Sequence, residues 1–325
     1  MVAVPRPQDI VGDRHGRGFG RRGGERARPM TRDRILVTGA NGELGRALLR
    51  ELGPQTAIAA TRTGAAPLPG FEHAPLGPDG APPADALARC RAVINAAGSV
   101  TGDQAALDAA NVHLPLTIAA SAKAAGVPKM VQVSSFSILG ITEYIHATTP
   151  EQPVSAYGRS KAEGDLAILA LAGDGFAVES LRLPFMFSAT KPGLLSPLLT
   201  LATKIRILPV ASGNPFRRSM LTYGGAAKQL ADCAASGHSG KSFTADPLLF
   251  DYPLFTAIVA DEAGVRVRIL TVPQAIASGV DRLLPAVGRR LFRSSILDPQ
   301  ANRARGEHLG LENELRRLVR ARYNK

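Results

Sequence analysis

Residues that mark disulfide-bonded and metal-binding proteins are scarce in this sequence. Only two of its 325 residues are cysteines, and tryptophan is absent. Cys90 and Cys233 lie far apart in the chain, and neither sits in a spacing typical of a metal or redox site. These features argue against a disulfide framework and fit a reducing compartment. We therefore expect a cytoplasmic protein without a metal site.

Long apolar runs are also lacking. The nearest candidate, LAILALAG at residues 166–173, is too short to cross a bilayer and is followed by Asp-Gly. The N-terminus contains no apolar stretch of the kind found in secretory signals. Hydrophobic residues still make up 45% of the chain, which is enough for a substantial core. We expect a globular protein with no membrane partner.

Acidic residues are outnumbered by basic ones, 27 against 39, which gives a formal net charge of +12. Seven Arg and three acids lie in residues 1–29, and GRGFGRRGG at 16–24 has no apolar period. Residues 1–31 are therefore predicted to be a disordered basic tail. Such a tail could bind single-stranded nucleic acid. We favour the alternative that translation starts at Met30, and we expect no nucleic-acid partner.

From Asp33 onward, apolar runs typical of strands alternate with helical patterns. The predicted helices are ELGRALLREL and residues 104–126 and 155–173, and the predicted strands are RILVTGA, TAIAAT, RAVINAAG, KMVQVSS and AVESLRLP. Strands that alternate with helices predict an α/β fold with a Rossmann-type, doubly wound parallel sheet. The strands are continuous apolar runs, as a parallel sheet covered on both faces requires.

This alternation ends after Pro184. Residues 189–216 show no clear period, a helix and a short strand are predicted within 224–246, and the last third of the chain reads as mostly helical. We therefore predict a Rossmann domain over 32–188 that also receives about 218–247. A smaller, mostly helical substrate-binding part would consist of 189–217 and 248–325.

The segment TGANGELG places three glycines between the first strand and the first helix. Gly39 allows a tight turn, while Gly42 and Gly45 let the backbone approach a pyrophosphate and let the helix pack on the strand. The segment after the second strand, AATRTG, contains Arg62 and lacks the acid that usually binds the NAD ribose. A guanidinium can pair with a 2′-phosphate, which favours NADP over NAD, although Arg62 could also be a solvated surface residue.

The segment AYGRSK places Tyr157 and Lys161 on one face at the start of a predicted helix. A free tyrosine has a pKa of about 10, and a nearby ammonium group with a positive nicotinamide ring would lower it. Tyr157 could then exchange a proton with a carbinol during hydride transfer. Ser135, at the end of an upstream strand, is our choice for a second hydroxyl on the same oxygen, with Ser134 and Ser137 as alternatives.

These motifs, in this order, resemble the short-chain dehydrogenase/reductase superfamily. The resemblance rests on TGANGELG, INAAG, VSSFSILG, AYGRSK and LRLP and covers nearly the whole chain from Arg34. The length and the downstream segments are similar to the extended branch, the NAD-dependent epimerase/dehydratase family, which acts on nucleotide sugars. SSFSILG and FRRSMLTYGGAAKQLADC look most like nucleotide-sugar 4-epimerases and 4-ketoreductases of bacterial surface-polysaccharide pathways.

The resemblance implies roles for individual residues. Ser135, Tyr157 and Lys161 match the catalytic set, and Arg218 matches the arginine that holds a nucleotide diphosphate. Arg293 is a looser second match, and Ser137 would also contact substrate. Together with Arg62, the expected cofactor-binding residues are Gly39, Asn41, Gly42, Glu43, Leu44, Gly45, Ala96, Ala97, Gly98, Asn111, Tyr157, Lys161 and Pro184.

Three segments depart from the family pattern. HAPLGPDG does not offer a clear match for the acid that usually follows the third strand and holds adenine. FSA at 187–189 and YGGAA at 223–227 replace the usual Tyr-Gly-Pro and Val-x-Asp-Leu-Ala. None of these belongs to the proton-transfer residues, so the departures leave the substrate open.

We therefore predict an NAD(P)-dependent enzyme that is a 4-epimerase or a 4-ketoreductase of a nucleotide sugar. The alternatives are an NADPH-dependent reductase of a lipophilic ketone and a non-catalytic dinucleotide sensor. The retained Tyr157 and Lys161 argue against a sensor. The helices predicted at 104–126 and 155–172 have small-residue faces, and the resemblance implies that they pair in a homodimer.

Overall fold

The structure is a computed structural model that describes residues 32–62, 64, 67–193, 195–213, 216–284 and 292–323. One compact unit spans Arg32–Lys325, and the predicted basic tail at 1–31 lies outside the described residues. Among the described residues, no helix is long and apolar enough to cross a membrane.

The secondary structure alternates as the sequence predicts. The strands are β1 (Arg34–Thr38), β2 (Ala57–Thr61), β3 (Glu72–Pro75), β4 (Cys90–Asn95), β5 (Lys129–Ser135), β6 (Tyr144–Ile145), β7 (Ala177–Leu183), β8 (Phe185–Phe187), β9 (Ile207–Ala211), β10 (Arg217–Arg218), β11 (Met220–Thr222), β12 (Gly240–Phe243), β13 (Phe250–Asp251), β14 (Arg268–Val272) and β15 (Ile296–Leu297). The helices are α1 (Glu43–Leu52), α2 (Ala84–Ala88), α3 (Gln104–Asp108), α4 (Leu114–Ala124), α5 (Ala156–Leu169), α6 (Leu195–Thr200), α7 (Tyr223–Ala235), α8 (Tyr252–Ala263), α9 (Gln274–Leu283) and α11 (Leu311–Tyr323).

Seven parallel strands form the central sheet in the order β12-β7-β5-β4-β1-β2-β3. The chain runs outward from β1 through β2 to β3 and then returns to β4 on the other side of β1. In such a sheet, ligands bind outside the carboxyl ends of the strands at the point of this reversal. The predicted doubly wound α/β fold is confirmed, and its crevice lies between β1 and β4.

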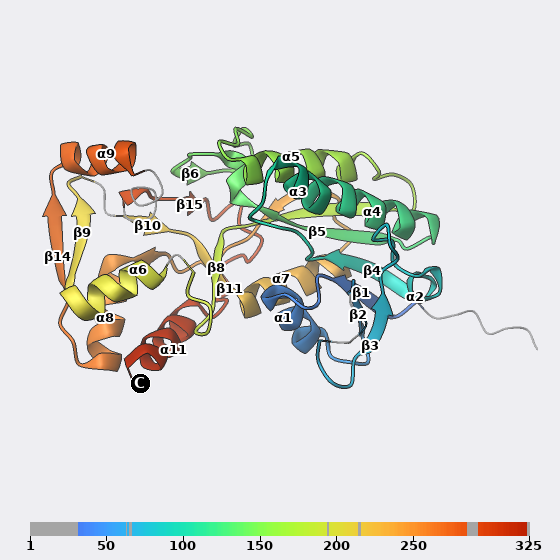
Figure 1. Ribbon diagram of the computed structural model, residues 1–325, viewed down its shortest axis with the longest axis horizontal. Helices are drawn as coiled ribbons and strands as arrows, with labels where there is room; N and C mark the ends of the chain where they lie inside the picture. The colour runs from blue at the N-terminus through green and yellow to red at the C-terminus, as the bar shows by residue number, and fades with distance from the viewer. Residues whose placement is uncertain are drawn as a thin grey trace, which may run out of the picture. The chain divides into compact units, whose positions relative to one another are not determined.

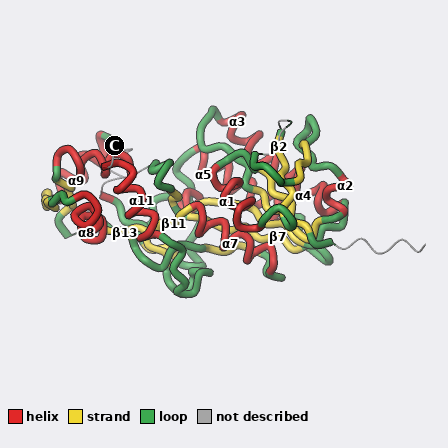
Figure 2. The backbone as a smooth tube through the Cα atoms, turned by 90° about the horizontal axis from the view of Figure 1, so that it is seen from below, coloured by secondary structure: helices red, strands yellow, loops and turns green. Residues whose placement is uncertain are grey.

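Helices cover both faces of the sheet (Figures 1 and 2). Alternate strand residues point to opposite faces, so Val37 and Ile94 pack under α1 and α7, while Leu36 and Val93 pack under α4 and α5. In Figure 1, α3, α4 and α5 are drawn above the strands and α1 and α7 below them. Both faces of the strands are therefore buried, as their continuous apolar sequences predict.

A second apolar cluster lies among elements that follow β8. It combines α6, β9, α8 and α11, with Phe216, Phe250 and Phe255 at its centre. The chain here is less helical than predicted, because β9 and β14 pair in parallel (Figure 1). The sequence hid this pair, since Pro209 interrupts one strand and the other lies in a segment with helix-like neighbours. The proposed boundary between the two parts of the chain stays a prediction.

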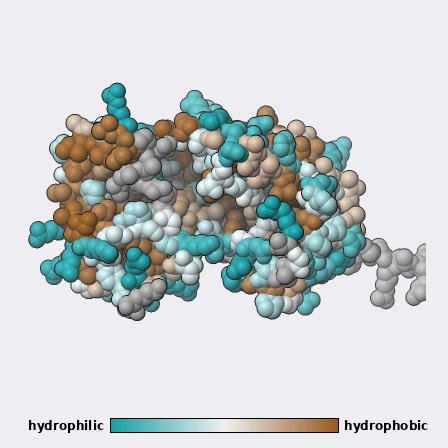
Figure 3. Space-filling model, in the orientation of Figure 1, coloured by the Kyte–Doolittle hydropathy of each residue, from teal (hydrophilic) through white to brown (hydrophobic). Residues whose placement is uncertain are grey.

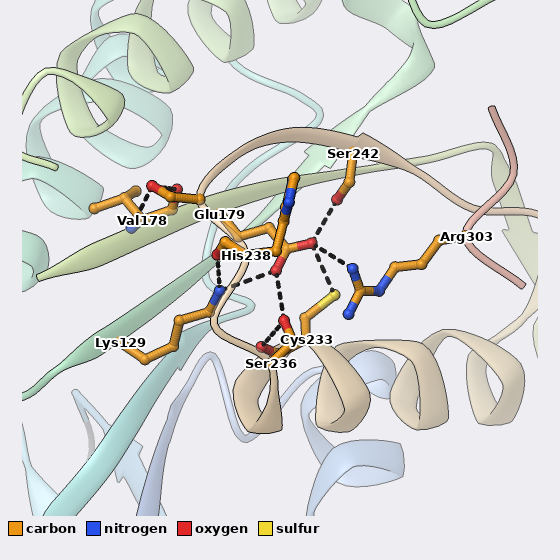
Figure 4. A network of polar contacts seen from close by, with 9 residues as sticks. Lys129, Val178, Glu179, Cys233, Ser236, His238, Ser242 and Arg303 are labelled. Carbon is orange, nitrogen blue, oxygen red and sulfur yellow. Dashed lines mark hydrogen bonds and ion pairs between the residues drawn. The ribbon is translucent and has the colours of Figure 1, made fainter.

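A buried carboxylate joins the edge of the sheet to distant parts of the chain. Glu179 of β7 is fully buried and pairs with Lys129 of β5 at 3.0 Å and with Arg303 at 3.1 Å (Figure 4). Ser242 of β12 donates a hydrogen bond to the same carboxylate at 2.8 Å. Burial acts to raise the pKa of Glu179, but the hydrogen bonds from Ser242 and Lys129 and the two nearby cations outweigh it and lower this pKa.

Replacing this carboxylate should destabilise the protein. Glu179→Gln leaves the buried Lys129 and the half-buried Arg303 without their counter-charge, so we expect the unfolding free energy to fall by about 3 kcal/mol. Urea unfolding measures this change, and Glu51→Gln on the exposed face of α1 should alter it by less than about 0.5 kcal/mol. Equal unfolding free energies of the wild type and Glu179→Gln at neutral pH would contradict this account.

The stabilisation from Glu179 should also depend on pH. Because the pKa of Glu179 is lowered in the folded protein, its contribution to the unfolding free energy is lost on acidification. The unfolding free energies of the wild type and Glu179→Gln should therefore converge well below pH 4.5.

Candidate active site

The turn between β1 and α1 depends on close backbone contacts that only glycine permits. Gly39 adopts φ +67°, and a Cβ added there would lie 2.6 Å from the backbone of Ala96 at the end of β4. A Cβ at Gly45 would lie 2.2 Å from the carbonyl oxygen of Gly39. The first turn of α1 therefore packs directly on the glycine turn, with its free N–H groups at the carboxyl edge of the sheet.

A cavity of about 840 Å³ opens above this turn. Seven of the predicted cofactor-binding residues line it, namely Gly39, Asn41, Gly42, Arg62, Ala96, Ala97 and Gly98. The volume is within the range of cofactor clefts. The missing side chains of the glycines leave room for a ligand's phosphates beside the helix N-terminus, so the residues present fit a dinucleotide.

The same cavity corrects one expectation from the sequence. We expected no well-placed acid in HAPLGPDG, yet Asp79 of this segment lines the cavity. Asp79 follows β3 in a tight turn, in which its carboxylate accepts a hydrogen bond from the Ala81 amide at 3.0 Å. The sequence concealed it because β3 is short and is recognisable as a strand only through its pairing with β2.

Glu43 and Leu44 are among the predicted residues that do not line this cavity. Leu44 packs into the core beneath α1, and Glu43 pairs with Lys191 at 3.2 Å. Both belong to the first turn of α1, so any role at a phosphate falls to their backbone N–H groups.

Asn111 lies one layer behind the cavity wall. The predicted helix at 104–126 contains a π-helical segment, Ala109–His113, between α3 and α4. Asn111 is fully buried in this segment, where it accepts a hydrogen bond from the Ser99 amide at 3.1 Å and donates one to the Ser99 carbonyl at 2.8 Å. A Cβ at Gly164 of α5 would lie 2.0 Å from the Asn111 carbonyl oxygen, so α5 packs tightly against this π-helical segment, or π-bulge. Such bulges are frequent at functional sites.

Lys161 reaches from α5 to the edge of the cavity. Its ammonium group donates a hydrogen bond to the Val133 carbonyl of β5 at 3.2 Å. The same nitrogen lies 3.1 Å from the position of a Cβ at Gly98, which lines the cavity. Burial lowers the pKa of Lys161 to about 8, and the negative charge of Asp165 opposes that shift.

Tyr157 lies one helical turn before Lys161, close to Ser135 at the end of β5. The Ser135 hydroxyl in turn donates to that of Ser137 at 3.1 Å. Burial is the largest effect on the pKa of Tyr157 and raises it, while the nearby Ser135 hydroxyl lowers it. The expected lowering by the ammonium group is therefore not the dominant effect in this structure, because the buried phenol is stabilised in its neutral form.

A second cavity adjoins Ser137. It is lined by Ser137, Pro184, Arg218 and Arg293, and it shares Arg293 with a further cavity along α9. The two arginines contact each other, because Arg218 Nε donates to the Arg293 carbonyl at 3.0 Å. Arg293 differs from expectation in one respect: its guanidinium also forms an ion pair with Asp281 of α9, through a 3.0 Å bond from Nε.

The structure thus brings the predicted residues together in two neighbouring places. The first cavity holds the glycine turn, and the second holds the two arginines. Tyr157 and Lys161 connect them, through Gly98 on one side and through Ser135 and Ser137 on the other. No group of three or more potential metal ligands is found among the described residues.

Comparison with known proteins agrees with this arrangement. A protein-family sequence model, described as "NAD dependent epimerase/dehydratase family", matches residues 35–206 of this chain. A curated relative is the 4-hydroxy-2-methyl-3-oxo-4-farnesyl-3,4-dihydroquinoline-1-oxide ketoreductase of Stigmatella aurantiaca. It is 24% identical over 289 residues, which cover 82% of this chain and 83% of the relative.

Solved structures share the fold at low sequence identity. MoeE5 in complex with UDP-glucose and NAD is 18% identical with a TM-score of 0.64, over 90% of this chain and 99% of the other. The UDP-glucuronic acid 4-epimerase of Bacillus cereus, in complex with NAD, is 13% identical with a TM-score of 0.64, over 89% of this chain and 98% of the other.

The tight glycine turn gives a direct test of the first cavity. Gly45→Ala places a methyl group against the Gly39 carbonyl and should displace the turn. We expect the dissociation constant for NADH, measured by its fluorescence, to rise at least about tenfold. Gly173→Ala is the matched control, since a Cβ there meets nothing within 4 Å and Gly173 is not held at positive φ. Unchanged NADH affinity in a folded Gly45→Ala variant would show that the turn does not hold the cofactor.

Proposed function

The chain belongs to the NAD-dependent epimerase/dehydratase family and is an enzyme, and from that premise we propose that it oxidises or reduces a nucleotide-activated sugar at C4. It would act as a 4-epimerase or a 4-ketoreductase. One observation carries the proposal: Tyr157 and Lys161 connect the cavity of the glycine turn to the cavity that contains Arg218.

The residues of the chain would divide the chemistry as follows. When bound, the nicotinamide cofactor accepts or donates the hydride. Tyr157 gives or takes the proton at its phenolic oxygen, and Ser135 holds the same substrate oxygen by a hydrogen bond. Lys161 would hold the cofactor ribose with its ammonium group, and Pro184 would lie beside the nicotinamide amide. A 4-epimerase and a 4-ketoreductase would use the same residues.

Arg218 is the proposed contact to the diphosphate of the substrate. It is partly buried, lines the second cavity and is oriented by the Arg293 carbonyl. An arginine in this setting suits a phosphate, because its planar guanidinium can donate two parallel hydrogen bonds. Arg293 is the weaker candidate, since Asp281 already pairs with its charge. The presence of UDP-glucose in one similar structure supports a nucleotide sugar.

We propose NADP rather than NAD as the preferred cofactor. Arg62 follows β2 and lines the first cavity, where its charge can pair with a 2′-phosphate. Two similar structures were solved with NAD. Arg62 is therefore the feature that would give this chain a different cofactor preference. The affinities of Arg62→Ala for NADPH and for NADH test this preference, and we expect the larger loss for NADPH. Equal losses of affinity for both cofactors would contradict it.

A lipophilic ketone is the second candidate substrate, and two observations favour it. The curated relative is a ketoreductase whose named substrate carries a farnesyl chain. Apolar side chains also gather over α9 and β14 (Figure 3), where Ile269, Leu270 and Ile276 are 41%, 52% and 56% exposed. The cavity along α9 includes Ala277 and Phe292, so an apolar substrate could extend toward this surface.

We also propose a cytoplasmic homodimer formed through α4 and α5. Leu166 on the outer side of α5 is 70% exposed, which a partner's helices would cover. Light scattering of the wild type and Leu166→Asp tests this assembly, and a monomeric wild type would exclude it.

The substrate proposal predicts a selective loss in one variant. Calorimetry with a panel of nucleotide sugars should show that Arg218→Ala weakens sugar binding at least about tenfold while NADPH affinity is unchanged. Arg217→Ala is the matched control, because it removes the same charge from the exposed neighbour. If the wild type binds cofactor but no nucleotide sugar, the sugar assignment fails and lipophilic ketones become the substrates to assay.

A further inference from the structure

A buried acid lies one helical turn beyond Lys161. Asp165 follows it by four residues on α5, and the two residues are 1% and 6% exposed. Residues at this spacing share one face of a helix. The catalytic roles proposed above use Tyr157, Ser135 and Lys161, and they assign nothing to Asp165.

The Asp165 carboxylate is held from the sheet. Ser134 of β5 donates a hydrogen bond to Asp165 Oδ2 at 2.8 Å, and Arg182 Nε of β7 lies 3.5 Å from the same oxygen. Ser134 and Arg182 are direct neighbours in the register of β5 and β7, so their side chains leave the same face of the sheet. This fixes Asp165 beside the strand end that carries Ser135.

Arg182 connects this acid to the surface. Its Nη2 donates to Glu151 at 2.5 Å, and Lys241 pairs with the same carboxylate. Charges of alternating sign therefore run inward from Lys241 through Glu151, Arg182 and Asp165 to Lys161. The titratable groups next to the innermost pair are Tyr157 on α5 and Arg182 on β7.

We propose that Asp165 is a positioning residue for Lys161. The Asp165 carboxylate keeps the buried ammonium group of Lys161 charged while that group holds the cofactor. The proposal rests on the proposed function, since it takes Lys161 as the ribose ligand. A buried ammonium group without a counter-charge loses its proton readily. Asp165 is buried close by, and its negative charge opposes the lowering of the pKa of Lys161 that burial causes. Burial raises the pKa of Asp165 itself, and the nearby Ser180 hydroxyl and the charge of Arg182 oppose that rise and favour the ionised carboxylate.

The pH dependence of NADH binding tests this role without turnover. In the wild type, the NADH affinity, measured by fluorescence, should fall as pH rises through about 8, where Lys161 loses its proton. In Asp165→Asn the pKa of Lys161 falls further, so the loss should begin about one pH unit lower. Asp165→Glu should return the midpoint toward the wild-type value, and Glu163→Gln, on the exposed side of the same helix, should leave it unchanged.

A second readout needs no ligand. The charge of Asp165 also raises the pKa of Tyr157, so tyrosinate should form at lower pH in Asp165→Asn. The difference in ultraviolet absorbance between each protein and its Tyr157→Phe counterpart isolates this residue. If the wild type binds neither NADPH nor NADH, the cofactor assignment fails, while this titration still shows whether Asp165 is charged beside Tyr157.

Ser134→Ala is the milder variant if Asp165→Asn does not fold. Removing the hydrogen bond from Ser134 favours the protonated form of Asp165. The pH midpoint of NADH binding and the titration midpoint of Tyr157 should therefore move in the same direction as in Asp165→Asn, by a smaller amount. A folded variant with weaker NADH binding but unchanged midpoints would overturn the proposal and assign Asp165 a packing role alone.

Discussion

The burial of one ammonium group is the constraint around which this site is built. Lys161 is 6% exposed, and a charge taken out of water is costly unless polar groups compensate it. The Val133 carbonyl accepts a hydrogen bond from this ammonium group, and the charge of Asp165 is the second compensation that we propose. Both depend on α5 lying close against β5. Gly164 lets the same helix pack closely against the π-helical segment, because any side chain there would collide with the Asn111 carbonyl.

The sheet topology explains why two cavities meet at this point. The carboxyl ends of β1 and β4 enclose the glycine turn, and the end of β5 presents Ser135 to Tyr157. The chain then continues beyond β7 into the elements that carry Arg218 and Arg293. A single helix, α5, supplies Tyr157 and Lys161, the proposed acid–base pair, to the region between them. Changes in the later elements can therefore alter the substrate while Tyr157 and Lys161 keep their places.

Features that depend on short sequence patterns could be predicted. The strands, the glycine turn and the Tyr157–Lys161 pair all follow from local spacing, and the structure shows each where expected, although the roles of these residues remain proposals. The π-helical segment around Asn111 could not be predicted, because the residue that packs against it, Gly164, belongs to another helix. Asp79 escaped notice for a related reason, since β3 is defined by its pairing with β2.

Charge pairing between distant segments was equally invisible in the sequence. The family resemblance suggests Arg293 as a looser match for a substrate ligand, but its partner Asp281 is found only in the folded chain. The same is true of Asp165 and Arg182, which come from α5 and β7. Residues of this kind determine how a recognisable motif behaves, and only their three-dimensional contacts reveal them.

The most direct test of the central claim is the rate of hydride transfer in Tyr157→Phe, followed by nicotinamide absorbance with the nucleotide sugar that binds most tightly. The account predicts a loss of about 10²- to 10⁴-fold relative to the wild type, with NADPH and sugar affinities retained, because the variant lacks only the proton-transferring hydroxyl. Turnover at the wild-type rate in Tyr157→Phe would contradict it and would place the acid–base residue elsewhere in the site.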